Sequence, residues 1–425
     1  MEYYETKELM ERAVLAGVHV GALDPLEDST EESLAELARL ADTAGATVVG
    51  TMLQNRPYAD SALYMGEGKL EELKLACEGL DANLVIFDDE LSPIQLRNIE
   101  RELGLRVIDR SMLILDIFAR HAVTREGKIQ VELAQLKYML PRLSGIGTQL
   151  SRLGAGIGTR GPGETKLETD RRHIRRRIGH LQEELREIKN HRELLRRRRE
   201  KDNTQVCALV GYTNAGKSTI LNALTDADVL AEDKLFATLD PTIRAITLDD
   251  GREPMLVDTV GFIRKLPHHL IEAFKSTLEE AVFADLLIIV IDSSSDEYEQ
   301  HIRVVNGILK DIGAEAKPRI YLFNKIDEKP QDLVLPSDIA DADAVLEISA
   351  KSGMGLTRFR EVLGEVLPGK KQRIKALIPY DKGSVLSNLH REQTVLSESY
   401  EAEGTLVEAF VDAQGYAQVR DYLVC

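Results

Sequence analysis

The 425-residue sequence has no tryptophan, only three cysteines and few aromatic residues, which make up 5% of the chain. Cys77, Cys207 and Cys425 are far apart, so they provide neither the paired spacing of a zinc site nor a disulfide framework. The longest apolar run, at residues 286–291, is far too short to span a bilayer. Residues 1–12 lack the basic and apolar segments of a signal peptide. We therefore expect a cytoplasmic protein without stable membrane insertion.

Positive charge is also scarce, and it is unevenly distributed. The chain has 54 Lys and Arg against 71 Asp and Glu, a net charge of −17, which by itself disfavours a nucleic-acid partner. Residues 121–200, however, contain 19 basic and 10 acidic side chains, so the rest of the chain carries a net charge of −26. One basic segment in an acidic protein can still bind phosphate locally.

The length predicts several domains, and the first alternates strand and helix patterns. Helix signals include an acidic start at residues 28–32 and Ser92 as an N-cap, with Pro93 at the first helical position and Gly104 after the helix end. Strands separated by helices imply parallel strands with right-handed crossovers. We therefore expect the α/β fold class, with an N-terminal parallel α/β domain over residues 1–110. The expected strands are residues 13–20, 47–53, 84–87 and 105–109.

Two later segments have apolar residues at steps of three and four. This spacing predicts two helices of matching length in an antiparallel helical hairpin over residues 111–202. The alternative is two ordinary amphipathic helices packed on a domain. The first apolar set is Ile129, Leu133, Leu136, Leu140 and Leu143, and the second is Ile174, Ile178, Leu181, Leu185 and Ile188.

The connector between these helices contains seven glycines within residues 145–163, interleaved with Arg152 and Arg160. It is either a flexible linker or a loop that contacts phosphate or another polar partner. Arginine clusters at residues 171–177 and 196–199 flank the second helix, and they form either a solvated face or a phosphate-binding surface.

The strongest chemical signal follows an apolar strand at residues 206–210. The next eight residues, 211–218, fit the P-loop pattern G-x-x-x-x-G-K-[ST] in full. In such a loop Lys217 contacts the β- and γ-phosphates, the Ser218 hydroxyl is a ligand of Mg²⁺, and the following helix directs its positive end at the phosphates. The candidate phosphate contacts are Gly211, Asn214, Ala215, Gly216, Lys217, Ser218 and Thr219.

Three companion motifs each follow an expected strand. Asp258 and Gly261 belong to an Asp-x-x-Gly motif, in which the aspartate reaches Mg²⁺ through water and the glycine N–H reaches the γ-phosphate. The carboxylate of Asp327 can accept hydrogen bonds from N1–H and N2–H₂ of guanine, so we expect GTP and GDP as ligands. This order of motifs predicts a doubly wound P-loop GTPase domain over residues 203–369. The base-binding candidates are Asn324, Lys325, Asp327, Ser349, Ala350 and Lys351.

The first switch belongs at residues 236–242. We expect Thr238 to join Ser218 as a Mg²⁺ ligand, with Thr242 as the alternative; both could also be ordinary loop threonines. The catalytic candidates are Lys217, Thr238 and Gly261. Phe262 stands where many GTPases have glutamine, so we expect slow intrinsic hydrolysis, completed by a group from a partner or from elsewhere in the chain. Phe262 could equally pack in the switch core.

Four segments together resemble the HflX GTPases of the Obg–HflX superfamily: residues 127–136, 158–165, 236–242 and 258–263. The resemblance covers about 370 residues of the chain, and it departs from the family at Lys166, where glutamine is usual. It implies a Mg²⁺-dependent, monomeric GTPase that binds the large ribosomal subunit in its GTP state. It further implies contact with ribosomal RNA through residues Gly145–Arg199, and a role in dissociating or rescuing ribosomes under stress.

Two other functions are compatible with these residues. The chain could be a ribosomal-subunit assembly GTPase, or a nucleotide-gated adaptor for a protein or membrane partner, because a basic amphipathic helix can bind a membrane surface. The last part, residues 370–425, resembles the small C-terminal domain of some family members. We expect it to be a small α+β domain with a strand at residues 405–411.

Overall fold

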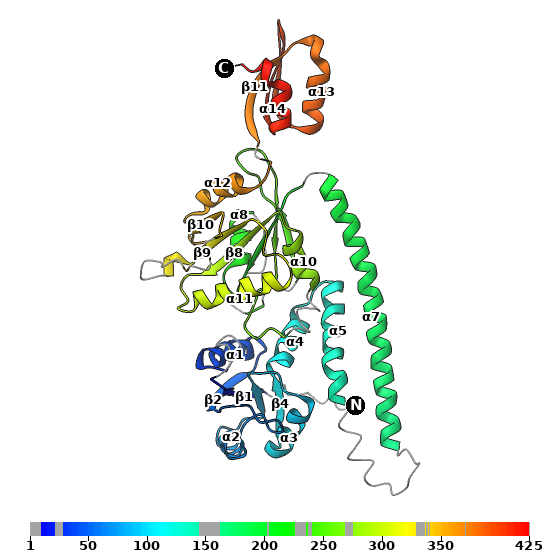
Figure 1. Ribbon diagram of the computed structural model, residues 1–425, viewed down its shortest axis with the longest axis vertical. Coiled ribbons are helices and arrows are strands. Elements are labelled where there is room, and N and C mark those ends of the chain that lie inside the picture. Colours follow the sequence, from blue (N-terminus) through cyan, green and yellow to red (C-terminus); the bar gives the residue numbers. More distant parts are fainter. Residues whose placement is uncertain are drawn as a thin grey trace, which may run out of the picture. The chain divides into compact units, whose positions relative to one another are not determined.

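The computed structural model describes residues 10–21, 29–143, 162–201, 204–225, 235–236, 240–267, 275–328, 336, 339, 341–369 and 371–424. The chain divides into two compact units (Figure 1). The first unit comprises residues 1–195, 232–240 and 260–278, and the second comprises residues 196–231, 241–259 and 279–425. The expected α/β fold class is confirmed by three sheets and their covering helices.

The first unit contains a parallel four-stranded sheet in the order β2-β1-β3-β4. All four expected strands are present, with ends shifted by at most two residues. The predicted start of α3 is also confirmed, because the Ser92 hydroxyl accepts from the Gln95 N–H and the Gln95 side chain accepts from the Ser92 N–H. The strands are β1 (Arg12–His19), β2 (Thr47–Asn55), β3 (Leu84–Phe87) and β4 (Arg106–Asp109). The helices are α1 (Glu31–Thr43), α2 (Glu67–Gly79), α3 (Pro93–Leu103) and α4 (Arg110–His121).

Two long helices, α5 (Arg125–Arg142) and α7 (Pro162–Lys201), pack side by side (Figure 1). Their buried contact is made by Ile129, Leu133 and Leu181, all of which belong to the predicted apolar sets. The expectation of matching lengths was wrong, because α5 has 18 residues and α7 has 40. The second helix continues beyond its apolar seam because this part of the sequence is rich in Glu, Arg and Leu, which favour helix, and contains no proline.

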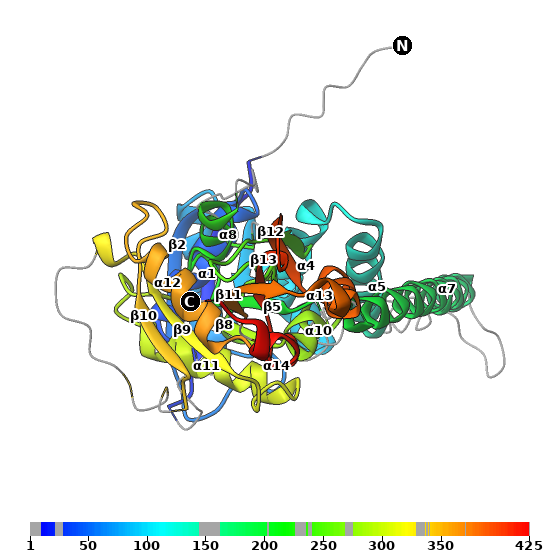
Figure 2. The same cartoon turned by 90° about the horizontal axis from the view of Figure 1, so that it is seen from above.

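The second unit contains a six-stranded sheet in the order β10-β9-β8-β5-β7-β6. Neighbouring strands are parallel except for β6, which runs antiparallel to β7. Figure 2 shows α8 and α12 on one face of this sheet and α10 and α11 on the other. The strands are β5 (Val206–Gly211), β6 (Thr242–Ala245), β7 (Met255–Asp258), β8 (Leu286–Asp292), β9 (Arg319–Asn324) and β10 (Ala344–Glu347). The helices are α8 (Lys217–Leu224), α10 (Lys275–Phe283), α11 (Tyr298–Asp311), η3 (Ile326–Glu328) and α12 (Leu356–Val366).

The last part of the chain forms an antiparallel sheet in the order β11-β13-β12, with two helices. The expected strand is β13 (Gly404–Val411), whose alternate residues face a small core. Its neighbour β12 is mostly exposed, and its sequence lacks the alternating apolar pattern from which a strand could be predicted. The other elements are β11 (Gln372–Ile378), η5 (Tyr380–Lys382), α13 (Gly383–Glu392), β12 (Thr394–Glu401), α14 (Ala413–Val419) and η6 (Arg420–Tyr422).

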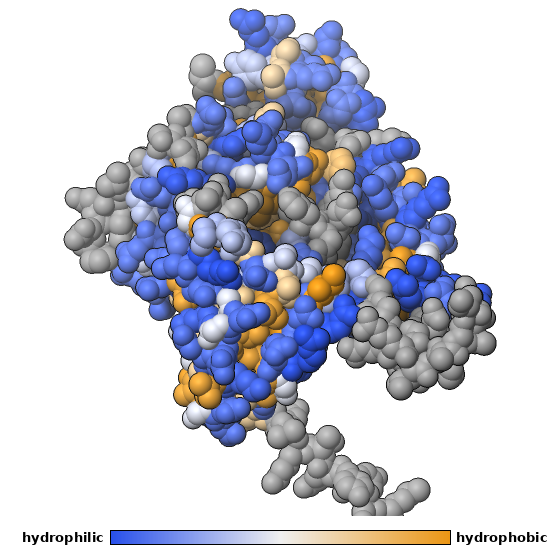
Figure 3. All heavy atoms as spheres, turned by 60° about the horizontal axis from the view of Figure 1, so that its bottom comes forward, coloured by the Kyte–Doolittle hydropathy of each residue, from blue (hydrophilic) through white to orange (hydrophobic). Residues whose placement is uncertain are grey.

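On the face drawn in Figure 3, hydrophilic residues cover most of the visible area and hydrophobic residues form smaller groups. Among the described helices, none is both long enough and apolar enough to cross a membrane.

Candidate nucleotide site

The P-loop connects β5 to α8, and its backbone requires glycine at two positions. Gly211 has a φ of +156° and Gly216 a φ of +93°. A Cβ atom on Gly211 would collide with the Val290 carbonyl oxygen, and one on Gly216 would collide with the Asn324 amide nitrogen. These positions are therefore fixed both by backbone conformation and by close packing.

Lys217, the first residue of α8, is buried with 6% of its surface exposed. Its Nζ donates to the Tyr212 carbonyl at 2.8 Å and to the Gly211 carbonyl at 3.2 Å. Burial lowers the pKa of Lys217 to about 8, although the nearby Asp258 carboxylate acts in the opposite direction. A phosphate group would supply the anionic partner that two neutral carbonyls do not.

The next residue brings together the oxygen atoms expected to bind a metal ion. The Ser218 hydroxyl donates to the Asp258 carboxylate at 2.6 Å, and Asp258 is fully buried at the end of β7. Hydroxyl and carboxylate oxygens are ligands that suit Mg²⁺. Thr242, the alternative ligand to Thr238, is paired with Asp258 in the β6–β7 ladder. Thr238 itself lies outside the described residues.

Asn324, one of the residues expected to bind the base, joins two loops at the carboxyl ends of the parallel strands. The Asn324 amide donates to the Ala215 carbonyl at 2.9 Å, and its oxygen accepts from the Ala350 N–H at 2.9 Å. Asn324 is therefore a bridge between the P-loop and the Ser-Ala-Lys loop. Lys325 pairs with Asp292 at 2.6 Å, a partner at the end of β8 that the sequence motifs did not indicate.

These loops surround one open pocket. Asp327 is exposed at its edge, and a hydrogen bond from Ser349 is the main reason that the pKa of Asp327 lies below its usual value. The carboxylate is therefore ionised at neutral pH and can accept hydrogen bonds from a ligand. The residues around the pocket are Asn214, Gly216, Thr219, Asn324, Lys325, Asp327, Glu328, Ser349, Ala350 and Lys351. All except Glu328 were expected from the sequence.

His301 also contacts the P-loop, although no sequence motif indicated it. The ring of His301, on α11, stacks on the ring of Tyr212 with centroids 3.9 Å apart and an interplanar angle of 19°. Nothing in the spacing of the chain links these two positions, which are almost ninety residues apart. The stack fixes the direction in which the second residue of the P-loop points.

The remaining expected residues belong elsewhere or are not described. Gly261 is part of the first compact unit, and the following Phe262 is fully buried. Residues 144–161, which include all of the glycine-rich connector except its last two residues, lie outside the described residues, as does the side chain of Lys166.

The chain matches known families over most of its length. Residues 31–119 match the family of GTP-binding GTPase N-terminal domains, residues 121–199 match the GTP-binding GTPase middle region, and residues 206–325 match the 50S ribosome-binding GTPases. The glycine-rich connector and the arginine clusters therefore fall within the middle region.

Individual relatives match almost the whole chain. The GTPase HflX of Caldanaerobacter subterraneus is 50% identical and covers 97% of this chain and 94% of that protein. The GTPase HflX of Escherichia coli is 41% identical, with 93% and 92% covered. A GTP-binding protein of Sulfolobus solfataricus, solved with GDP, is 29% identical, covers 84% of this chain and 98% of its own, and has a TM-score of 0.44. The full-length sequence matches show that this chain belongs to the HflX family of GTP-hydrolysing enzymes.

Proposed function

We propose that this GTPase binds the large ribosomal subunit in its GTP state and acts as a ribosome-dissociating or rescue factor. The observation that carries the proposal is the match of residues 206–325 to the 50S ribosome-binding GTPases. The relatives named GTPase HflX extend this likeness over the whole chain. The charge distribution on α7 supplies a second, independent line of support.

We assign the phosphate contacts to the P-loop. Lys217 and the loop N–H groups, with Asn214 among the contacts, bind the β- and γ-phosphates, and the Gly261 N–H binds the γ-phosphate. Ser218 would hold Mg²⁺, with Thr238 as a further ligand in the GTP form and Asp258 acting through water. The ion would neutralise charge on the phosphate oxygens. The full contact set is Gly211, Asn214, Ala215, Gly216, Lys217, Ser218, Thr219, Asp258 and Gly261.

We assign the base contacts to the pocket beside Asn324. The Asp327 carboxylate accepts from two guanine N–H groups, and adenine offers no such pair. Asn324 holds the pocket in shape by bonding the P-loop and the Ala350 N–H. Lys325, Ser349, Ala350 and Lys351 complete the lining.

The chemistry that remains is the positioning of the attacking water. Phe262 is buried and its side chain has no polar atom, so it cannot orient water. Hydrolysis of GTP depends strongly on such positioning and on charge stabilisation in the transition state. We therefore expect a slow intrinsic rate, which rises when the ribosome or another part of the chain completes the site.

The basic end of α7 is the surface proposed to contact ribosomal RNA. Arg172, Arg175 and Arg176 are exposed and form no ion pair with any other described residue. Toward the other end of the helix, Arg192 pairs with Glu126 and Arg196 pairs with Glu280. Three exposed arginines without an ion pair among the described residues therefore lie in the half of α7 nearer to the glycine-rich connector. Arginines in this arrangement bind phosphates without reading the base sequence.

Ribosome co-sedimentation tests the proposal. The protein is mixed with ribosomal subunits in GDP or in a non-hydrolysable GTP analogue, over a series of salt concentrations. We expect binding to the large subunit with the analogue, and a steep decrease as salt rises. Dissociation of intact ribosomes, followed by light scattering, tests the splitting activity separately.

A matched pair of variants locates the RNA contact. Replacement of Arg172, Arg175 and Arg176 by Gln should weaken subunit binding at least tenfold, because three phosphate contacts are lost. Replacement of the exposed residues Arg186, Lys189 and Arg197 by Gln changes the charge equally, and a smaller loss of binding than with the first set would place the main contact at the connector end of α7. Absence of binding in both nucleotide states, with hydrolysis intact, would reject the ribosomal part. Accumulation of precursor particles in a deletion strain, without any splitting, would favour subunit assembly instead.

A further inference from the structure

The two segments proposed to contact the γ-phosphate pack with the first unit. Residues 232–240, which include Thr238, and residues 260–278, which include Gly261, belong to the unit that holds the N-terminal sheet and the long helices. The P-loop and Asp258 belong to the second unit. Each segment is therefore joined along the chain to residues of the second unit.

The first segment is anchored to the start of α5. One oxygen of the Asp240 carboxylate accepts from the backbone N–H groups of Val123 and Thr124, both at 2.8 Å. The other oxygen accepts from the Thr124 hydroxyl, and Thr124 is the N-cap of α5. A carboxylate at this end of a helix is also favoured by the helix dipole. Four residues earlier, the ring of Phe236 packs edge-on against Phe118 of α4, with centroids 4.6 Å apart.

The close approach of Asp240 depends on a glycine. A Cβ atom on Gly127, in the first turn of α5, would lie 2.5 Å from Asp240 Oδ1. Alanine is otherwise the better helix former at such a position. The glycine at residue 127 thus leaves room for the carboxylate.

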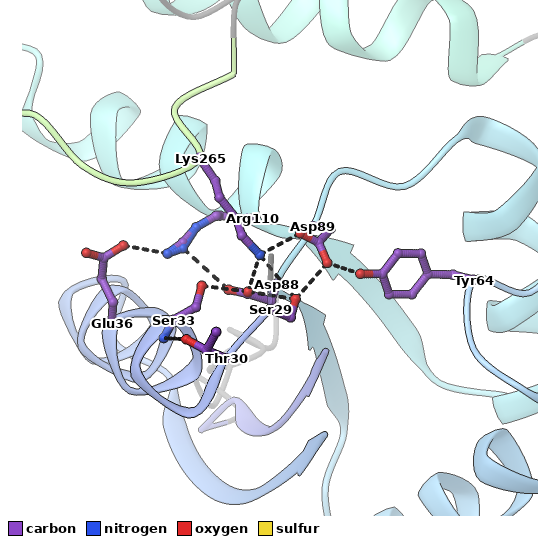
Figure 4. A network of polar contacts seen from close by, with 9 residues as sticks. All are labelled: Ser29, Thr30, Ser33, Glu36, Tyr64, Asp88, Asp89, Arg110 and Lys265. Carbon is purple, nitrogen blue, oxygen red and sulfur yellow. Dashed lines mark hydrogen bonds and ion pairs between the residues drawn. The ribbon is translucent and has the colours of Figure 1, made fainter. Parts of the chain in front are cut away.

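The second segment is anchored by Lys265, four residues after Gly261. Its Nζ lies 2.6 Å from Asp88 Oδ2, 2.6 Å from Asp89 Oδ1 and 3.1 Å from the Ser29 hydroxyl (Figure 4). Asp88 is fully buried, and the Lys265 side chain is 8% exposed. The two carboxylates lie just after β3, and Ser29 lies just before α1.

The carboxylate cluster extends into three elements of the N-terminal domain. Arg110, the first residue of α4, contacts Asp88 at 3.4 Å and Glu36 of α1 at 2.5 Å. The Tyr64 hydroxyl donates to Asp89. Figure 4 shows the Lys265 side chain directed into this cluster from a separate segment of the chain. A displacement of Lys265 therefore removes one positive charge from a cluster whose other charged members belong to α1 and α4 or follow β3 directly.

We propose that Asp240 and Lys265 transmit the state of the nucleotide to the N-terminal domain and to α5. The proposal rests on the roles assigned to Thr238 and Gly261 above. Asp240 is two positions after Thr238, and Lys265 is four positions after Gly261, so each anchor is within about 14 Å of chain from the γ-phosphate contact. Movement of the first segment on hydrolysis acts on the solvent-exposed hydrogen bonds of Asp240, and movement of the second acts on the buried contact between Lys265 and Asp88. Each of these contacts is either made or broken rather than gradually deformed. By linkage, a partner that binds the N-terminal domain changes nucleotide affinity in return.

Hydrogen exchange of the full chain, with GDP and with a non-hydrolysable GTP analogue, tests whether Asp240 and Lys265 transmit the state of the nucleotide. In the wild type we expect the P-loop peptide, residues 211–219, to be protected by both nucleotides. Peptides over residues 84–92 and 123–131 should differ between GDP and the analogue. Gly127→Ala should abolish the difference at 123–131, and the pair Lys265→Met with Asp89→Asn should abolish it at 84–92. The pair is used because it removes one positive and one negative charge together, which limits destabilisation.

Two control variants separate transmission from general disturbance. Gly68→Ala, also in the first turn of a helix, adds a methyl group where nothing lies within 4 Å and should leave both differences unchanged. Lys265→Arg keeps the positive charge and should retain the difference at 84–92. An unchanged difference in both test variants would overturn the proposal, as would a wild type in which only the P-loop responds. Loss of P-loop protection in the wild type would instead reject the nucleotide assignments. The Gly127→Ala result stands independently if the paired variant fails to fold.

Discussion

The side chains of Lys217 and Lys265 are both largely shielded from solvent, but their surroundings differ. Lys217 donates to two neutral carbonyl oxygens, and burial lowers its pKa to about 8. Lys265 lies against two carboxylates and a hydroxyl. The first ammonium group has a charge that the fold leaves for a ligand to balance, whereas the charge of the second is balanced inside the fold. Burial of a charged residue therefore does not by itself distinguish a binding group from a structural one; its partners do.

The largest expected effect comes from removing the ligand-facing charge. Lys217→Met should reduce the rate of GTP hydrolysis by about 10²–10³-fold, because a preorganised positive charge on the transferred phosphate is lost. Its free energy of unfolding in the absence of nucleotide should not fall, since a desolvated ammonium group has been removed. Single-turnover hydrolysis and urea unfolding measure the two quantities. A loss of stability as large as the loss of activity would contradict this account of Lys217.

The internally paired charge should behave in the opposite way. Lys265→Met leaves Asp88 buried beside a lost partner, so the free energy of unfolding should fall by about 3 kcal/mol. We place the value at the low end of the known range because Asp89 keeps some contact with solvent. The affinity for GDP should change by less than about threefold, since Lys265 lies outside the proposed contact set. Lys69→Met, which breaks an exposed pair with Glu72, is the matched control and should cost less than about 1 kcal/mol.

The same contrast explains what the sequence could and could not predict. The P-loop, Asp258 and the motif around Asn324 are short patterns at strand ends, so their meeting point could be predicted from local spacing and parallel topology, while their chemical roles stay predictions. The two carboxylate partners of Lys265 are 176 and 177 residues away, and no periodicity links them. His301 beneath Tyr212 and Asp292 beside Lys325 were missed for the same reason. Contacts between distant segments depend on the tertiary arrangement, which a motif does not contain.

Fold prediction shows the same limit. Strands in the N-terminal domain were predicted nearly to the residue because they are buried apolar runs between clear helix signals. The length of α7 was not predicted, because the sequence of its last turns has neither an apolar seam nor a capping residue or proline that would mark the end of the helix. The exposed strand β12 gave no signal at all, since pairing with β13 rather than burial holds it in place.

The same comparison can be made with two carboxylates, Asp327 and Asp88, and here the expected effect is smaller. Asp327 is exposed toward the base pocket, whereas the donors to Asp88 are supplied by the fold. Asp327→Asn should lower the affinity for GDP by about 10- to 100-fold, because one bidentate contact with guanine is lost. It should also favour xanthine nucleotides, which offer an acceptor where guanine has its amino group. Competition binding measures this, and Glu328→Gln at the same pocket is the control.

The smallest expected effect is on the pH dependence of stability. Burial opposes ionisation of Asp88, but Arg110 and Lys265 outweigh it and hold the pKa of Asp88 below its usual range. The folded state therefore binds this proton less readily than the unfolded state. The contribution of Asp88 is fully present above the unfolded pKa of about 4, and it is lost as the pH falls through the lower folded value. Urea unfolding from pH 6 to pH 3 should show a shallower acid loss for Asp88→Asn; an unchanged slope would contradict the assignment.

The increase in unfolding free energy caused by GDP tests the central contrast most directly. A ligand at a hundred times its Kd adds about 2.7 kcal/mol to stability. At that GDP concentration Lys265→Met should start from a lower stability and keep nearly the whole increment. Lys217→Met should start from wild-type stability or above and lose most of the increment. If both variants lose stability and increment together, the two buried lysines do not have separate roles and the account is wrong.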